Sequence, residues 1–207
     1  MMRLEMRAPL LDWAVASRAH PDQTASGDCY VVAPLPSGVL LGAVDGLGHG
    51  AEAAAAACTA VTLLEAHRRE SVIDLVHRCH AALATTRGVV MSLASYDALD
   101  RTLTWIGVGN VEGIVLRADR GADPSRQTLL LRGGVVGYQI PELHASVVSV
   151  SPGDTLVFAT DGIRGDFGWR LDPGDPPRKI ADRILVEHGN TRDDALVLVV
   201  RFPGVEP

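Results

Sequence analysis

The sequence predicts an α+β fold in which antiparallel β-sheet layers are flanked by helices. Three observations predict it: short apolar runs with strand character come first, two helical segments follow as a group, and six further β-rich runs come after them. One helix and one apolar strand complete the chain. This order differs from the regular alternation of strands and helices that produces a parallel α/β sheet.

The first predicted strands are residues 11–18, 29–33 and 39–44. A polar loop separates the first two, and a Pro-Ser-Gly turn precedes the third. The third strand is apolar throughout, which is typical of a strand buried on both faces. It ends at Asp45, and the glycine-rich stretch 46–50 then leads into a helix.

Two helices are predicted next, over residues 51–67 and 71–85. The first is made almost wholly of strong helix formers. Helical spacing predicts that its core-facing side carries Ala54, Ala57, Cys58, Val61 and Leu64. Ser71 is predicted to be the N-cap of the second helix.

The rest of the chain changes to short β-rich runs separated by turn residues. The predicted strands are residues 89–97, 102–108, 112–117, 128–132, 145–150 and 155–160. A helix over residues 180–188 and a strand over residues 195–202 follow. Because no repeat or low-complexity linker divides the chain, we expect a single domain over residues 1–207.

Composition excludes several classes of protein. With 47% hydrophobic and 21% charged residues the chain is not disordered as a whole. A net charge of -6 argues against sequence-independent nucleic-acid binding. The longest apolar helical stretch, residues 51–64, is shorter than the ~20 residues that span a bilayer, and no signal peptide is evident. We therefore expect a cytoplasmic protein without a membrane or nucleic-acid partner, whose three cysteines are reduced and buried.

The strongest chemical signal is a set of aspartates at the ends of predicted strands. Asp45 and Asp161 each follow an apolar run and precede a glycine, Asp28 precedes an early strand, and Asp193 and Asp194 open the last one. A single Asp-Gly pair is more often a simple turn. At the end of a buried sheet, however, a carboxylate needs a cation or a hydrogen-bond network to offset its desolvation. Oxygen donors of this kind suit Mg²⁺ or Mn²⁺ and make a poor zinc site.

These motifs, taken together and in chain order, resemble the metal-dependent serine/threonine protein phosphatases of the PPM, or type 2C, class. Within that class the chain is similar to the bacterial sporulation-stage-II-E-like branch. The resemblance rests on residues 27–28, 44–50, 159–163 and 192–200. It implies a sandwich of two antiparallel β-sheets flanked by helices, in agreement with the element order above.

The resemblance also implies a site with two Mn²⁺ or Mg²⁺ ions. The residues that it implies as metal ligands are Asp28, Asp45, Gly46, Asp161, Asp193 and, as the alternative to Asp193, Asp194. The catalytic set that it implies is Asp28, Asp45, Asp161 and Asp193. Asp45 would bridge the ions, the carbonyl of Gly46 would bind one of them, and Asp28 would act mainly on metal-bound water. A water that bridges the two ions, acidified to hydroxide, would then attack phosphorus, so that no cysteine or serine nucleophile is needed.

Some positions depart from the pattern of the family. Leu196 stands where the family often has Thr or Ser, and Asn110 lies where some relatives have Asp, which argues against a third metal ion. Only about thirty residues separate Asp161 from Asp193, so we expect a short flap and an open site. His49, in the glycine-rich turn, is expected either to serve helix entry alone or to contact phosphate or transfer a proton.

The activity that the resemblance implies is metal-dependent phosphoserine/phosphothreonine protein phosphatase activity. Without an attached sensor module, the chain is similar to the stand-alone feedback phosphatases of stressosome signalling. The implied partner is a phosphorylated STAS-domain protein, either a stressosome subunit or an anti-sigma-factor antagonist. Two alternatives stay open: a phosphoprotein-binding module without turnover, and a hydrolase of small phosphate esters that uses the same metal chemistry.

Overall fold

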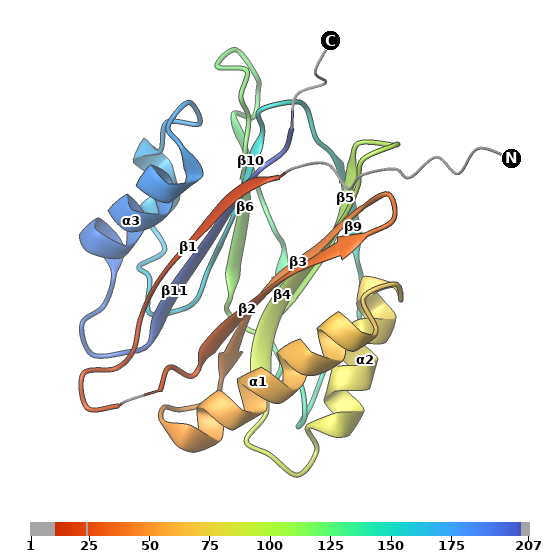
Figure 1. Ribbon diagram of the computed structural model, residues 1–207, viewed down its shortest axis with the longest axis vertical. Coiled ribbons are helices and arrows are strands. Elements are labelled where there is room, and N and C mark those ends of the chain that lie inside the picture. Colours follow the sequence, from red (N-terminus) through yellow and green to blue (C-terminus); the bar gives the residue numbers. More distant parts are fainter. Residues whose placement is uncertain (1–10, 24, 204–207) are drawn as a thin grey trace, which may run out of the picture.

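Two β-sheets pack face to face in the computed structural model, which describes residues 11–23 and 25–203 (Figure 1). The first sheet is antiparallel throughout and has the order β1 (Asp12–Arg18), β11 (Ala195–Arg201), β10 (Thr155–Ala159), β6 (Glu112–Leu116), β7 (Arg126–Thr128). The second sheet has the order β2 (Asp28–Leu35), β3 (Gly38–Gly46), β4 (Val89–Asp97), β5 (Thr102–Val108), β8 (Leu131–Arg132), and β9 (Ser146–Ser149) also pairs with β5. The predicted α+β sandwich is confirmed, with one parallel pair between β5 and β8.

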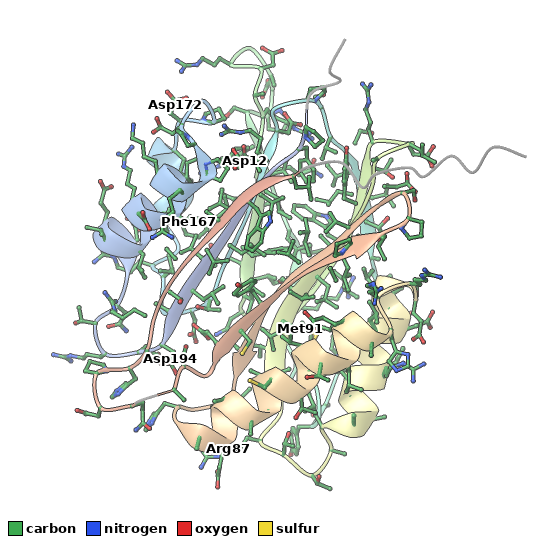
Figure 2. The ribbon with its side chains drawn as sticks, in the orientation of Figure 1. Asp12, Arg87, Met91, Phe167, Asp172 and Asp194 are labelled. Carbon is green, nitrogen blue, oxygen red and sulfur yellow. The ribbon has the colours of Figure 1, made fainter. Side chains whose placement is uncertain are left out.

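Helices cover both outer faces of the sandwich. The helices α1 (Ala51–Ala66) and α2 (Val72–Ala82) pack on the second sheet, whereas α3 (Pro177–His188), preceded by the 3-10 helix η1 (Phe167–Arg170), packs on the first. Figure 2 shows Met91 between α1 and its sheet and Phe167 on the side of the first sheet that faces α3. The molecule therefore has three apolar layers, one under each set of helices and one between the sheets.

Strand β3 explains how a continuous apolar run becomes a strand. Because successive side chains of a strand point to opposite faces, Val39, Leu41 and Ala43 enter the layer between the sheets. Leu40 and Val44 point the other way, into the layer under α1 and α2. Both faces are buried, as the sequence predicts.

The face of α1 that packs on the sheet differs from the expected one. The buried residues are Ala53, Ala56, Ala57, Ala60 and Leu64, so the helix is rotated and Cys58 is exposed. The small alanine side chains allow α1 to lie close to β2 and β3, and this contact selects the face. The expectation of three buried cysteines is therefore also wrong. Cys58 is exposed, Cys29 is half-buried, and of the three only Cys79 is fully buried.

The strand predicted over residues 128–132 is in fact two short strands in different sheets. Thr128 at the end of β7 pairs with Ile114 in the first sheet, and Leu131 in β8 pairs with Gly107 in the second. Leu129 is buried between the sheets, whereas Leu130 is 71% exposed. The chain crosses from one sheet to the other at this point, which alternation of apolar residues along the sequence does not reveal.

The other predicted elements are confirmed with small shifts at their ends. Ser71 caps α2, and its hydroxyl accepts a hydrogen bond from the backbone N–H of Asp74. Among the described residues, no helix has both the length and the apolar character that crossing a membrane requires.

Candidate active site

Two of the candidate aspartates face each other across neighbouring strands. Asp28 begins β2, Asp45 lies near the end of β3, and the register of the antiparallel pair places them directly opposite. Directly opposed residues of an antiparallel pair have Cβ atoms about 5 Å apart. Strand pairing alone therefore brings these two carboxyl groups together, although like charges in such positions repel each other.

The first sheet supplies the other two carboxylates. Asp161 follows β10 and Asp193 precedes β11, and the two strands are paired, with Thr160 donating its backbone N–H to the carbonyl of Leu196. Both aspartates are within electrostatic range of Asp28 and Asp45. Four carboxyl groups from segments far apart in the sequence thus meet at one end of the sandwich.

Asp194 has a different position from its neighbour Asp193. Its carboxylate is buried and accepts two backbone hydrogen bonds, from the N–H of His20 at 2.8 Å and from the N–H of Gly27 at 2.9 Å. Gly27 in turn accepts the backbone N–H of Gly46. Asp194 therefore ties the loop before β2 to the start of β11, and Figure 2 shows it at the end of the sandwich away from Asp12.

Two side chains hold the carboxylates in place. Thr160 donates its hydroxyl hydrogen to Oδ2 of Asp28 at 2.7 Å, and the backbone N–H of Leu196 donates to the same hydroxyl. Asn110 donates its amide to Oδ2 of Asp161 at 2.8 Å. An apolar Leu196 is compatible with this arrangement, because its contribution is the backbone N–H.

The glycines that follow two of the aspartates have a packing role. A Cβ on Gly46 would lie 2.2 Å from the carbonyl oxygen of Ala53 in α1, and a Cβ on Gly162 would overlap the backbone of Asp194. Only glycine allows the first turn of α1 and the start of β11 to approach so closely. The Asp-Gly pairs thus fix where the neighbouring elements begin.

The carboxylates open into a cleft of about 710 Å³. It is lined by acidic, cationic and small residues, among them Asp45, Asp161, Asp193, Arg192, His20 and His49. The two imidazole rings stack with their centroids 5.0 Å apart. A second cleft, of about 440 Å³ between the end of β6 and η1, contains none of the candidate aspartates.

Burial and neighbouring charges favour the protonated forms of Asp28 and Asp45. Burial, followed by the charges of Asp194, Asp161 and Asp193, raises the pKa of Asp28 to about 7, although the hydrogen bond from Thr160 opposes the shift. Burial raises the pKa of Asp45 to about 9, with further contributions from the charge of Asp28 and from the charge and hydrogen bond of Asp161.

A divalent cation fits this donor set by its chemistry. Carboxylate and carbonyl oxygens are the ligands that Mg²⁺ and Mn²⁺ prefer, and a cation among them would reverse the repulsion that raises both pKa values. In the described part of the chain, no three His, Cys, Asp or Glu side chains are already arranged to coordinate one metal ion.

The structure adds residues that motif reasoning did not assign to the site. Thr160, Arg192 and His20 lie at the site. Two of them had a weak signal in the sequence, because Thr160 directly precedes Asp161 and Arg192 directly precedes Asp193. His20 had none, because it lies in a polar loop. His49 lines the cleft, so helix entry is not its only structural role.

Comparison with known proteins identifies the family of the chain. The chain matches the family model for Stage II sporulation protein E (SpoIIE) over residues 36–203. It is 24% identical over 171 residues to "Phosphoserine phosphatase RsbX" of Bacillus subtilis (strain 168), covering 81% of this chain and 83% of that protein.

Solved structures show the same fold. A chain from a study of the bacterial stressosome, a modular system adapted to control secondary messenger signaling, superposes with a TM-score of 0.82 at 28% identity, over 92% of this chain and 99% of that one. RsbX in complex with magnesium also superposes with a TM-score of 0.82, at 20% identity, over 92% and 94% of the two chains.

Proposed function

The chain belongs to the stage II sporulation protein E (SpoIIE) family and is a PP2C-type protein serine/threonine phosphatase, and on that premise we propose that it dephosphorylates STAS-domain regulators of a stress or sigma-factor pathway. The observation that carries the proposal is the meeting of four carboxyl groups at one end of the sandwich: Asp45, Asp161 and Asp193 line an open cleft, and Asp28 is buried behind it. The similarity to RsbX and to a stressosome chain supports the choice of pathway.

We assign two Mg²⁺ or Mn²⁺ ions to this cleft, held by the side chains of Asp45, Asp161 and Asp193 and by the carbonyl of Gly46. Asp45 would be the central ligand in this assignment, because it lies directly opposite Asp28 in the strand pair and lines the cleft together with Asp161 and Asp193. When bound, the ions neutralise phosphoryl oxygens and acidify the attacking water. The magnesium complex of RsbX supports the choice of cation.

Asp28 is assigned the role of accepting the proton that the attacking water loses. Its carboxyl group is buried behind the cleft, and the Thr160 hydroxyl fixes one of its oxygens. Without a cation, burial raises the pKa of this carboxyl group to about 7, and a bound cation would lower it. Thr160 is a positioning residue, because it acts through Asp28.

Arg192 is assigned to binding the phosphoryl group. Its side chain lines the cleft beside Asp193, and a guanidinium can donate two parallel hydrogen bonds to phosphate oxygens. His20 and His49, stacked on each other, add nitrogen donors at the same cleft. These residues orient the ester while the carboxylates hold the ions.

The cysteines are poor candidates for the nucleophile. Burial and the neighbouring Cys58 raise the pKa of Cys29 to about 12, and burial raises the pKa of Cys79 to about 12 as well. The thiolate is the nucleophilic form of cysteine, so both groups are inert near neutral pH. Neither lines the cleft. This supports attack by water.

The decisive experiment measures hydrolysis of p-nitrophenyl phosphate and of a phosphorylated STAS domain by the purified protein, with Mn²⁺ and with excess EDTA. We expect at least about a 100-fold loss of both activities in EDTA and in Asp45→Asn, because the ions provide most of the charge stabilisation. Asp100→Asn, in the β4–β5 turn at the far end of the second sheet, is the matched control and should behave as the wild type.

Each other outcome selects a different function. Full activity in EDTA would exclude the metal mechanism. Turnover of the aryl phosphate without turnover of any phosphoprotein would indicate a hydrolase of small phosphate esters. Metal-independent binding of the phosphoprotein without turnover would indicate a binding module.

A further inference from the structure

Another hollow, different from the cleft near η1, adjoins the carboxylate cleft. It has a volume of about 470 Å³ and is lined by Gly133, Gly134, Val135, Tyr138, Gln139, Ile140 and Pro141, and we name it the Tyr138 groove. Residues 133–135 line both hollows, so the two adjoin at a shared wall. A ligand held at the carboxylates therefore has the Tyr138 groove beside it.

The groove differs chemically from the cleft. None of its seven lining residues carries a charge, whereas the cleft contains aspartates, an arginine and histidines. Its side chains offer apolar and aromatic surface, together with the single amide of Gln139. An apolar segment fits this groove better than a charged one.

The segment that forms the groove is firmly held. Val136 is buried and exchanges two backbone hydrogen bonds with Val89, at 2.8 and 2.9 Å. Gly137 donates its N–H to Nδ1 of His80 in α2 at 3.0 Å. Val135 and Gln139 close the turn with backbone hydrogen bonds at 2.7 and 2.9 Å. The turn is thus anchored to both β4 and α2.

Tyr138 lies on this anchored turn and is 81% exposed. A large aromatic side chain in water is normal when it is isolated, but this one lies at the edge of an apolar groove that adjoins the candidate active site. A tyrosine presented on a rigid turn loses little conformational entropy when a partner covers it. Its position makes it suited to contact a substrate.

We propose that the Tyr138 groove binds the part of the substrate polypeptide that flanks the phosphoserine or phosphothreonine, and that it selects an apolar side chain there. The inference rests on the proposed phosphatase function. The proposal is argued from the position of the groove next to the cleft. When the phosphoryl group lies among Asp45, Asp161 and Asp193, an adjacent part of its polypeptide can cross the shared wall at Gly133–Val135 into the groove. The groove would thus select among phosphoproteins.

The test uses a series of phosphoserine peptides of equal length, with Mn²⁺ present. Leucine replaces glycine at one position at a time, from four residues before the phosphoserine to four after it. The readout is the ratio of kcat/KM for each leucine peptide to that for the all-glycine peptide. We expect a ratio of about ten at one or more positions on one side of the phosphoserine. A tenfold ratio corresponds to the free energy gained when a leucine side chain is partly buried.

Three variants connect this preference to the groove. Tyr138→Ala should reduce the ratio to below about two, and Tyr138→Phe should retain it because the contact is apolar. Leu99→Ala is the matched control: Leu99 is 67% exposed and lies in the β4–β5 turn, at the opposite end of the second sheet from Asp45, so the ratio should stay near ten.

The other outcomes overturn the proposal in distinguishable ways. A wild-type enzyme that hydrolyses p-nitrophenyl phosphate and all peptides without preference would refute the groove while leaving the proposed function intact. A protein that hydrolyses none of these compounds would refute both. If sedimentation shows that Tyr138→Ala only converts a dimer to a monomer, with the peptide ratio unchanged, the groove is a contact between copies of this chain.

Discussion

At the scale of single residues, two adjacent aspartates have different surroundings. Asp193 lines the cleft, where its carboxylate contributes to the repulsion at Asp28 and Asp45. Asp194 accepts two backbone N–H groups, which satisfies a buried carboxylate without a cation. We therefore assign metal binding to Asp193 and a structural role to Asp194.

Replacing each of these aspartates by asparagine tests the assignment. Asp194→Asn replaces one carboxylate acceptor by an NH₂ group facing a backbone donor, so we expect a loss of about 2 kcal/mol in the free energy of unfolding, or about 5 °C in Tm. Asp193→Asn should leave the Tm of the metal-free protein unchanged or higher and should abolish Mn²⁺-dependent activity.

Calorimetry and an activity assay measure the two effects. If Asp194→Asn is inactive at full stability while Asp193→Asn keeps near wild-type activity, the ligand is Asp194 and the assignment is wrong by one residue.

The raised pKa values predict the pH dependence of stability in the metal-free protein. Both pKa values, about 7 for Asp28 and about 9 for Asp45, lie above the value of about 4 in an unfolded chain. The folded state therefore binds more protons than the unfolded state. The stability that the folded state gains from binding these protons is fully present below about pH 4. It is lost as pH rises through 7, the pKa of Asp28, and then through 9, the pKa of Asp45.

In EDTA we thus expect the Tm to fall steadily from pH 5 to pH 9. The Tm of Asp45→Asn should fall less between pH 7 and pH 9, because the amide of Asn does not ionise. The Tm of Asp100→Asn should follow that of the wild type. Differential scanning calorimetry at fixed ionic strength measures this. A wild-type Tm that rises over this range would contradict the sign of the shifts.

At the scale of secondary-structure elements, the site is made where strands end. Asp28 and Asp45 share a register pair of β2 and β3, while Asp161 and Asp193 flank the paired strands β10 and β11. Gly46 and Gly162 allow the next element to pack against each turn. The positions of the carboxylates therefore depend on backbone contacts between elements.

Gly46→Ala tests this dependence. Its Cβ would meet the backbone of Ala53, so the first turn of α1 must shift, and we expect a loss of about 2 kcal/mol in stability together with severely reduced activity. Gly133→Ala is the control for stability, because a Cβ there meets no atom within 4 Å. Thermal unfolding should separate the two variants; equal Tm values would show that α1 adapts to the added methyl group.

At the scale of the whole molecule, the two sheets expose the site at one end of the sandwich. The segment between Asp161 and β11 is short, and its helices η1 and α3 pack on the first sheet. Neither helix contributes a residue to the lining of the carboxylate cleft. A folded phosphoprotein can therefore approach the site directly.

We expect an intact phosphorylated STAS domain to be a better substrate than a phosphopeptide cut from it, by at least about tenfold in kcat/KM, because contacts away from the phosphoryl group are lost with the peptide. Initial rates at several concentrations of each substrate measure this. Equal values would show that recognition is confined to the residues around the phosphoserine.

The sequence alone predicted the α+β class, most element positions and the set of candidate aspartates. Alternation of apolar residues, the Ser71 cap and the Asp-Gly pairs at strand ends are local signals, readable because side-chain direction follows from local backbone geometry. Two predictions were wrong: a single strand over residues 128–132, and the buried face of α1. Both depend on which strands the segment contacts in the folded protein.

Only the tertiary structure decided how the aspartates are placed. Asp193 and Asp194 have the same chemistry and adjacent positions, and what separates them is the loop holding His20 and Gly27, more than 160 residues away in sequence. The same holds for Thr160, whose hydroxyl reaches Asp28, and for Tyr138, whose groove shares a wall with the carboxylate cleft. Hydrogen bonds and shared cleft walls between distant segments have no local pattern, so the folded chain alone determines them.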